Sequence, residues 1–445
     1  MTKAQTISFI ASPGGQLTGD LRVPGDKSIS HRSIMLGSLS EGTTVVEGFL
    51  QGEDSLATLE AFKSLGVEIE GPDEEGKVII HGVGMKGLKP AESALDLGNS
   101  GTSMRLLTGL LAAQDFDISL TGDHSLSSRP MKRVIDPIQQ MGALIESTPQ
   151  GTAPLLIRGG QALTAIDYQL PMASAQVKSC ILLAGLYATG KTCVTEPAPT
   201  RDHTERMLKG FGYSSLDVHT IDSQQSTICL TGGGKLTACN IDVPADISSA
   251  AFFMVGASIA AGSDLTLKHV GTNPTRTGVI NILKLMGADI NLSNEQEVGG
   301  EPVADIRIRS ANLHGIHIPE DQVPLAIDEF PALAIAAACA AGQTIVSGAE
   351  ELRVKESDRI QAMVDGLQIL GIDCQATADG MIINGGEIGE GTVNSLGDHR
   401  IAMSFAMAAL RAQGEIRINN CANVNTSFPG FVQLAQSSGL SLKAI

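Results

Sequence analysis

Positively charged side chains recur at two kinds of position in this chain: at the start of apolar helices, and in the loops before a second set of helices. They are Lys27, Arg32, Arg129, Arg201, Lys355, Arg359, His399 and Arg400. A guanidinium forms paired hydrogen bonds with phosphate or carboxylate oxygens, and a lysine ammonium acts as a point charge. Any one of them could be a solvated surface group, but their equivalent positions predict a site for small phosphorylated or carboxylated molecules.

The overall charge argues against larger anionic partners. The 445 residues carry a net charge of −17, with no Trp and only 3% aromatic residues. Such a surface repels polyanions and offers few rings on which bases could stack. We therefore expect neither nucleic acid nor membrane as a partner, and an anionic ligand must be held by a local positive site.

The chain also lacks the sequence features of export or of a membrane span. Its longest apolar stretches, such as 250–261, are shorter than the 18 residues that a span needs, and residues 1–15 show no signal-peptide pattern. We therefore expect a cytoplasmic protein. Its seven cysteines are scattered and form no CxxC pair, which predicts reduced thiols rather than a disulfide framework or a zinc site.

The elements that must position the cations form a sixfold repeat. Each repeat runs from a short strand through a polar start into an almost wholly apolar helix of about three turns, followed by a turn and another strand. The six copies are residues 23–39, 97–112, 170–186, 243–260, 327–340 and 396–410. Helices that are apolar on every side are buried, so three per domain predict a helical core wrapped by sheets.

A second, amphipathic helix follows in each copy and stops at a glycine, which suits a left-handed helix cap. These glycines are Gly66, Gly142, Gly212, Gly287, Gly371 and Gly439, between 68 and 84 residues apart. Two short strands follow each cap, except after the last one. The N-terminal TISFIA is the natural replacement for the missing strand. We therefore expect an α/β fold with one domain at 21–240, a second made of 1–20 plus 241–445, and a hinge near residues 20 and 240.

The buried helices begin with polar residues, such as Asp26, Ser174 and Asp246. Taken singly, these are ordinary N-caps. Taken together, parallel packing would direct six helix N-termini, each with about half a positive charge, at one inter-domain cleft. Such a cleft would attract phosphates and carboxylates.

Six segments together resemble the EPSP synthase family, and the resemblance extends over essentially the whole chain. They are PGDKSISHR (24–32), GNSGTSMR (98–105), SRPM (128–131), SAQVKS (174–179), RVKESDR (353–359) and DHRIAM (398–403). The family has a two-domain inverse α/β fold of six βαβαββ repeats that closes on its substrates, in agreement with the repeat found above.

The resemblance implies transfer of the carboxyvinyl group of phosphoenolpyruvate to the 5-hydroxyl of shikimate 3-phosphate, as part of aromatic amino-acid biosynthesis. It assigns shikimate 3-phosphate to Lys27, Ser28, Arg32, Ser174, Ala175, Gln176, Arg201, Asp328 and Lys355, with Ala175 acting through its backbone. It assigns phosphoenolpyruvate to Lys27, Asn99, Gly101, Arg129, Gln176, Lys355, Arg359 and Arg400.

The same resemblance implies the proton transfers. One group must take the proton of the 5-hydroxyl, and another must protonate the methylene carbon of phosphoenolpyruvate. Asp328 is the candidate base, Glu356 the candidate acid and later base, and Lys27 a further proton-transfer candidate. Helix capping remains the alternative for Asp328. No metal or cofactor is expected, and domain closure needs no second subunit, so we expect a monomer.

One departure from the family concerns the C-terminal segment. Many members have a Lys before the (T/S)FP motif, whereas this chain has Thr426 before Ser427 and Phe428. Together with SAQVKS and Arg201, this makes the chain similar to the second, bacterial class, whose members are often glyphosate-tolerant. Gly101 is nevertheless retained where a methyl group would crowd glyphosate, so we predict inhibition.

Rival functions remain. The related UDP-N-acetylglucosamine enolpyruvyl transferase uses a reactive Cys on a loop of its first domain, whereas the first Cys here, Cys180, falls in a predicted buried helix. A non-catalytic anion-binding homologue would lack Asp328 and Glu356. GLYATGKT (185–192) matches a P-loop pattern, but it ends a helix and leads into a strand, the wrong order for binding a nucleotide phosphate.

Overall fold

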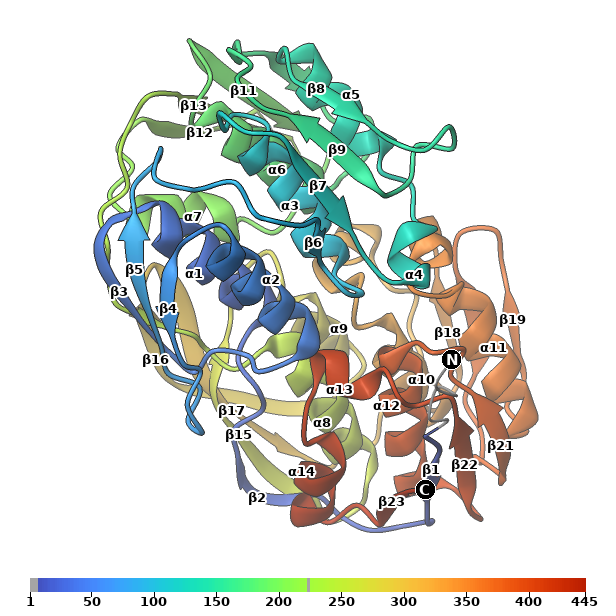
Figure 1. Cartoon of the computed structure of the whole chain (residues 1–445). Coiled ribbons are helices and arrows are strands. Elements are labelled where there is room, and N and C mark those ends of the chain that lie inside the picture. The colour runs from blue at the N-terminus through green and yellow to red at the C-terminus, as the bar shows by residue number, and fades with distance from the viewer. Residues whose placement is uncertain (1–6, 222–224) are drawn as a thin grey trace. The chain divides into compact units, whose positions relative to one another are not determined.

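The computed structural model of the chain describes residues 7–221 and 225–445. It alternates helices and strands and divides into two compact units (Figure 1). Unit 1 contains the chain up to Pro24 together with Pro244–Glu297 and Pro302–Ile445, and unit 2 contains Gly25–Val243 and Val298–Glu301. Residues 1–6, the start of the segment 1–20 that was predicted to join the second domain, lie outside the described residues.

Three buried helices form the centre of each unit. They are α1 (Lys27–Leu39), α3 (Gly101–Leu111) and α6 (Ala175–Gly185) in unit 2, and α8 (Ile247–Ile259), α10 (Phe330–Ala338) and α12 (His399–Ala408) in unit 1. In unit 2, α3 packs against α1 and α6, and in unit 1 the three helices contact one another. Each unit has its own hydrophobic core around these helices, which confirms the predicted architecture.

The six amphipathic helices are also present. They are α2 (Glu53–Ser64), α5 (Lys132–Gln140), α7 (His203–Gly210), α9 (Gly278–Leu285), α11 (Arg359–Ile369) and α14 (Phe431–Ser438). The predicted cap glycine follows each of them with φ between 78° and 119°. This left-handed conformation strains any residue with a Cβ, which explains why a glycine follows the amphipathic helix in every copy.

In unit 2 each repeat forms a four-stranded sheet with one parallel edge strand and antiparallel pairing elsewhere. In spatial order, the first sheet contains β14 (Ile241–Asp242), β3 (Glu41–Glu47), β5 (Val78–Val83) and β4 (Glu68–Glu70). The second contains β6 (Leu95–Asp96), β7 (Ile118–Thr121), β9 (Leu155–Arg158) and β8 (Leu144–Glu146). The third contains β10 (Asp167–Gln169), β11 (Lys191–Glu196), β13 (Ser226–Thr231) and β12 (Leu216–Thr220).

Unit 1 repeats this plan, except that its second sheet has three strands, which pair antiparallel. Its first sheet contains β2 (Thr18–Leu21), β15 (Asp264–Gly271), β17 (Glu301–Arg309) and β16 (Asp289–Val298), and its second contains β18 (Gln343–Val346), β20 (Met381–Asn384) and β19 (Cys374–Ala376). The third contains β21 (Gly391–Asn394), β22 (Ile416–Asn419), β1 (Phe9–Ala11) and β23 (Leu442–Ala444). The dark-blue β1 is antiparallel to both β22 and β23 (Figure 1), so the N-terminal strand does replace the missing strand of the sixth copy.

Two edge strands are exchanged between the first and the fourth repeat. β2 precedes α1 in the sequence but pairs with β15 of the fourth repeat, and β14 precedes α8 but pairs with β3 of the first repeat. The chain changes unit after these strands end, between Pro24 and Gly25 and between Val243 and Pro244. The segment Val298–Glu301, which connects β16 to β17, belongs to unit 2 and was not foreseen. The hinge stays a prediction.

The remaining elements are short. They are α4 (His124–Ser127), α13 (Val424–Ser427) and the 3₁₀ turns η1 (Glu320–Gln322), η2 (Pro324–Ala326), η3 (Glu350–Val354) and η4 (Ala409–Arg411). α6 ends at Gly185 and β11 begins at Lys191, which confirms that the P-loop-like stretch runs from helix to strand. Within the described part of the chain, no helix combines the length and apolarity that crossing a membrane requires.

The prediction of reduced thiols is wrong for two of the seven cysteines. Cys193 on β11 and Cys229 on β13 form a disulfide, with Cα atoms 4.1 Å apart. They are directly opposite in the antiparallel ladder, and the backbone N–H of Cys193 donates to Ile166 on the other side of β11. The two cysteines therefore form a non-hydrogen-bonded pair, in which the strands approach most closely. A separation of 36 residues gives no sign of this register in the sequence.

Candidate functional site

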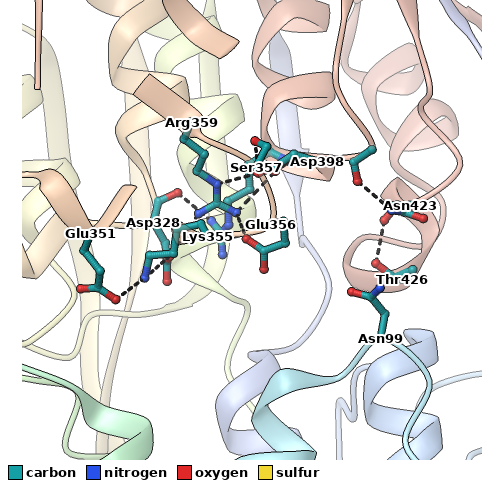
Figure 2. Close-up of polar contacts among 12 residues, drawn as sticks. Asn99, Asp328, Glu351, Lys355, Glu356, Ser357, Arg359, Asp398, Asn423 and Thr426 are labelled. Atoms are coloured by element: carbon teal, nitrogen blue, oxygen red, sulfur yellow. Dashed lines mark hydrogen bonds and ion pairs between the residues drawn. The ribbon is translucent and has the colours of Figure 1, made fainter. Parts of the chain in front are cut away.

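One buried guanidinium organises the polar groups of unit 1. Arg359, the first residue of α11, is 1% exposed and donates to carboxylates from three segments of the chain (Figure 2). Its Nε lies 2.8 Å from Asp398 Oδ2, its Nη1 3.3 Å from Asp328 Oδ1, and its Nη2 2.5 Å from Glu356 Oε2. Burial alone lowers the pKa of Arg359, but Asp398, Glu356 and Asp328 outweigh that effect and raise it above its ordinary value. Arg359 is therefore a permanent positive charge that holds three carboxylates.

A second cation borders Asp328. Lys355 Nζ lies 3.7 Å from Asp328 Oδ1 and 2.7 Å from Glu351 Oε1 (Figure 2). The same carboxylate oxygen of Asp328 thus has two cations as neighbours, Arg359 and Lys355. Glu351 was not predicted, because its spacing from Lys355 is that of any surface ion pair on a helix.

The N-termini of the three buried helices of unit 1 meet beside this group. Arg400 on α12 donates to the backbone oxygen of Asp328 at 3.0 Å and lies 3.8 Å from Glu329 Oε1. Glu329 accepts a hydrogen bond from Ser248 on α8. Ser248 in turn accepts from Arg276 at 2.6 Å.

Capping was the alternative role for several of these residues. Asp246 and Asp398 do cap α8 and α12, because their carboxylates accept backbone N–H bonds at 2.9 Å. α10 begins at Phe330, and Glu329 occupies its N-cap position without a capping bond from its side chain to the helix backbone. Asp328 lies one residue earlier, and its carboxylate contacts the cations Arg359 and Lys355. The cap interpretation therefore does not apply to Asp328.

In unit 2, Lys27 is the first residue of α1 and forms an ion pair with Asp54 on α2. The Lys27 side chain is 24% exposed, whereas that of Asp54 is 8% exposed. Asp54 was missed because an acid in the first turn of a helix is an ordinary stabilising feature. Ser28 follows Lys27, and its carbonyl accepts from Arg32 at 3.0 Å.

Arg32 lies deeper than the sequence suggested. It is 4% exposed, and its guanidinium donates to Thr204 Oγ1 at 2.7 Å and to Ser179 Oγ at 2.8 Å. Burial lowers its pKa to about 10, and the negative charge of Glu205 opposes that shift. Arg32 stays charged at neutral pH and joins α1 to α6 and α7.

Asn99, which precedes α3, and Arg129, which follows α4, contact each other. Arg129 Nη2 donates to Asn99 Oδ1 at 2.6 Å and to Ser125 Oγ at 3.1 Å, and Asn99 donates to Asp123 at 2.7 Å. Gly101 borders this group. A Cβ at Gly101 would lie 3.1 Å from Arg105 Nη1 and 3.2 Å from Arg129 Nη1, so a methyl group there would press on two guanidinium groups.

Gln176 joins the N-terminus of α6 to that of α3. Its side-chain oxygen accepts from Arg105 Nη1 at 2.5 Å, and its nitrogen donates to Thr102 Oγ1 at 3.1 Å. Arg105 was not chosen from the sequence, although it ends the segment GNSGTSMR. Ser174 caps α6 by accepting from Val177 N at 3.4 Å. Ala175 begins that helix.

Arg201 is partly buried and lies two residues before α7. Thr426, where many family members have Lys, is 9% exposed and donates its hydroxyl to the backbone oxygen of Asn423 at 2.7 Å. Of the residues that the structure describes, only Glu68, Glu70 and His81 gather as metal-ligating side chains, on the first sheet of unit 2 and apart from the residues above.

Each unit therefore gathers cations and hydrogen-bonding groups at the N-termini of its buried helices. The family model of EPSP synthase (3-phosphoshikimate 1-carboxyvinyltransferase) matches residues 11–434. The chain belongs to the EPSP synthase family. Curated relatives match this chain over nearly their full length. Proteins named 3-phosphoshikimate 1-carboxyvinyltransferase from Methylococcus capsulatus and Nitrosococcus oceani are 66% and 64% identical, covering 98% of this chain and 98% and 97% of theirs.

Solved structures agree with the family and with the fold. The EPSP synthase of Acinetobacter baumannii has a TM-score of 0.89 and 60% identity over 99% of this chain and 100% of its own. The enolpyruvyl transferase NikO of Streptomyces tendae has a TM-score of 0.78 over 99% of each chain, but at 16% identity it supports the fold alone.

Proposed function

We propose that this EPSP synthase family member transfers the carboxyvinyl group of phosphoenolpyruvate to the 5-hydroxyl of shikimate 3-phosphate and releases phosphate. The observation that carries the proposal is the group around Arg359, where two candidate acid–base carboxylates, Asp328 and Glu356, are held by one buried cation. Both proposed substrates are multiply anionic, so the cations of both units have a use in the same reaction.

Binding is shared among the predicted residues. Shikimate 3-phosphate contacts Lys27, Ser28, Arg32, Ser174, the backbone of Ala175, Gln176, Arg201, Asp328 and Lys355. Phosphoenolpyruvate contacts Lys27, Asn99, Gly101, Arg129, Gln176, Lys355, Arg359 and Arg400. The internal bonds of Arg129 and Gln176 support these assignments, because they hold both side chains in defined orientations before any ligand arrives.

The reaction proceeds by addition and elimination. Asp328 takes the proton of the 5-hydroxyl as its oxygen attacks C2 of phosphoenolpyruvate, and Glu356 delivers a proton to the methylene carbon, giving a tetrahedral intermediate with a methyl group. Glu356 then removes a proton from that methyl group while the C2–O bond to phosphate breaks, and the proton taken by Asp328 leaves with the phosphate. Lys27 is a further proton-transfer candidate. Arg359 and Lys355 stabilise the anionic intermediate and the departing phosphate.

The finer features follow the same resemblance. We propose a cytoplasmic monomer of the second class that needs no metal ion and closes about the crossings between its units. Thr426 replaces a lysine ligand in this proposal, so phosphoenolpyruvate depends more heavily on Arg129, Arg359 and Arg400.

Phosphate release tests the proposal directly. Purified protein receives phosphoenolpyruvate with and without shikimate 3-phosphate, in the presence of a chelator. Release that requires both substrates and ignores the chelator is the expected result. Release with UDP-N-acetylglucosamine instead would assign the rival transferase reaction, and no release with either acceptor would favour an anion-binding homologue.

A further inference from the structure

Lys178 is a charged residue buried in unit 2 for which the proposed reaction gives no role. It lies in the second turn of α6 within SAQVKS and is 1% exposed. Its Nζ lies 2.7 Å from Glu205 Oε1 and 3.0 Å from Glu196 Oε2, and both carboxylate side chains are 5% exposed. Burial lowers the pKa of Lys178, but Glu205 and Glu196 outweigh this and raise it, so the ammonium stays charged. A buried charge is costly unless paired, so this contact holds its three elements together.

Two of these elements, β11 and α7, flank one short segment. Glu196 is the last residue of β11, Glu205 lies in the first turn of α7, and residues 197–202 connect them. That segment contains Arg201, a candidate ligand of shikimate 3-phosphate. α6 itself begins with Ala175 and Gln176, two more candidate ligands. Lys178 is thus linked to both groups of candidate ligands, through its own helix and through its ion pairs with Glu196 and Glu205.

The side chain of Glu196 also contacts the segment 197–202 directly. Its Oε2 accepts a hydrogen bond of 2.6 Å from Thr200 Oγ1, and its Oε1 accepts one of 2.9 Å from Ser226 on β13. Thr200 directly precedes Arg201, while Pro197 and Pro199 each restrict their own φ angle. The segment is therefore restrained from β11 as far as the residue before Arg201.

We propose that Lys178, Glu196 and Thr200 are positioning residues that set the affinity for shikimate 3-phosphate by fixing the backbone that presents Arg201. This inference rests on the proposed function, because that function assigns Arg201 to this substrate. None of the three residues needs to touch the substrate. Replacing them should therefore change the KM for shikimate 3-phosphate and leave the proton-transfer steps unchanged.

Thr200→Val is the sharpest test, because it removes one hydroxyl and leaves the buried charges paired. We expect the KM for shikimate 3-phosphate to rise about tenfold, as for the loss of one hydrogen bond to a charged group. The kcat and the KM for phosphoenolpyruvate should stay within about twofold.

Thr195→Val is the matched control. Thr195 lies on the same strand and shares a hydrogen bond of 2.8 Å with Thr227, but on the opposite face from Glu196. It should leave all three constants unchanged, and Thr200→Ser, which keeps the hydroxyl, should restore the wild-type KM. Equal KM values for Thr200→Val and Thr195→Val would overturn the inference.

A double-mutant cycle tests whether Thr200 acts through Glu196. Glu196→Gln should raise the KM for shikimate 3-phosphate, and adding Thr200→Val should then change it by less than about threefold. Independent, multiplying effects would contradict the proposed route. Failure of the proposed function itself would look different, because the wild-type protein would then release no phosphate in response to shikimate 3-phosphate.

Discussion

In unit 2 the guanidinium groups of Arg32 and Arg129 are oriented by neutral oxygens, whereas in unit 1 that of Arg359 is surrounded by carboxylates. Arg129 donates to Asn99 and Ser125, and Arg32 to Ser179 and Thr204. Neutral partners fix the orientation of a cation without cancelling its charge. These groups of unit 2 are therefore suited to attract anions.

Unit 1 has the opposite balance. Lys355, Arg359 and Arg400 lie among five carboxylates, which are those of Asp328, Glu329, Glu351, Glu356 and Asp398. The negative charge of these five carboxylates weakens anion binding, but the carboxylates supply groups that can accept and donate protons. The difference suggests a division of labour, in which unit 2 contributes mainly affinity and unit 1 mainly proton transfer.

The largest expected effect comes from removing the candidate acid of unit 1. Glu356→Gln should lower kcat by about 10³-fold or more, since general acid–base groups contribute about 10²–10⁴-fold, and should leave the Kd for shikimate 3-phosphate unchanged. Steady-state kinetics and calorimetric titration measure the two quantities. Glu351→Gln, a neighbouring acid that contacts Lys355, should lower kcat less than tenfold. Near-normal turnover of Glu356→Gln would remove Glu356 from the mechanism.

A neutral replacement in unit 2 should act on binding instead. Arg129→Gln should raise the KM for phosphoenolpyruvate by about 10–100-fold, the loss expected when charged hydrogen bonds are removed, with a smaller effect on kcat. Arg158→Gln is the control, because Arg158 is an exposed arginine of the same unit that pairs with Asp117 and Glu146. A fall in kcat with unchanged KM would contradict the division of labour.

A smaller effect is expected from crowding the same cations. Gly101→Ala should raise the KM for phosphoenolpyruvate several-fold and weaken inhibition by glyphosate, because the new methyl group presses on Arg105 and Arg129. Gly210→Ala is the control, since the nearest atom to its added Cβ is 3.6 Å away. Inhibition curves at low phosphoenolpyruvate measure both variants. Wild-type activity that persists in millimolar glyphosate would refute the predicted inhibition.

The smallest effect on activity, and a distinct effect on stability, is expected at His31 in unit 2. Its ring contacts Thr58 Oγ1 at 2.7 Å, and burial, followed by the charge of Lys27, lowers its pKa from 6.5 to about 3. The unfolded chain takes up a proton near pH 6.5 but the folded chain does not, so stability falls as the pH drops from 6.5 towards 3. From pH 7 to pH 5 the loss is about 2 kcal/mol.

Urea denaturation of wild type and His31→Gln at both pH values measures this loss. The variant should lose about 2 kcal/mol less than the wild type over the same interval. Equal pH dependence of wild type and His31→Gln would show that His31 does not titrate as its burial requires.

Much of the fold could be predicted because its signals are local and repeated. An apolar helix and a glycine with positive φ mark every copy, and the missing strand after Gly439 pointed to the N-terminus. The exchange of β2 and β14, and the pairing of Cys193 with Cys229, depend on which distant strands become neighbours. No local sequence pattern predicts which distant strands become neighbours.

The candidate site divides in the same way. Most of the cations and the acid Glu356 lie within the six segments that resemble the family, and Asp328 lies at the start of the fifth repeat copy, but the partners of these residues carry no such signal. Asp54 resembles an ordinary helix start, and the contact of Lys178 with Glu196 joins residues on different elements. Such partners become visible only when the elements are packed.

Solvent deuterium tests the division of labour most directly. In D₂O at saturating substrates, protonation by Glu356 and its reversal should place deuterium in the methylene group of the carboxyvinyl product, which mass spectrometry detects. The wild type and Arg129→Gln should incorporate deuterium at rates that follow their kcat values, and Glu356→Gln should lose incorporation and turnover together while it still binds shikimate 3-phosphate. Deuterium incorporation by Glu356→Gln at the wild-type rate would contradict the account.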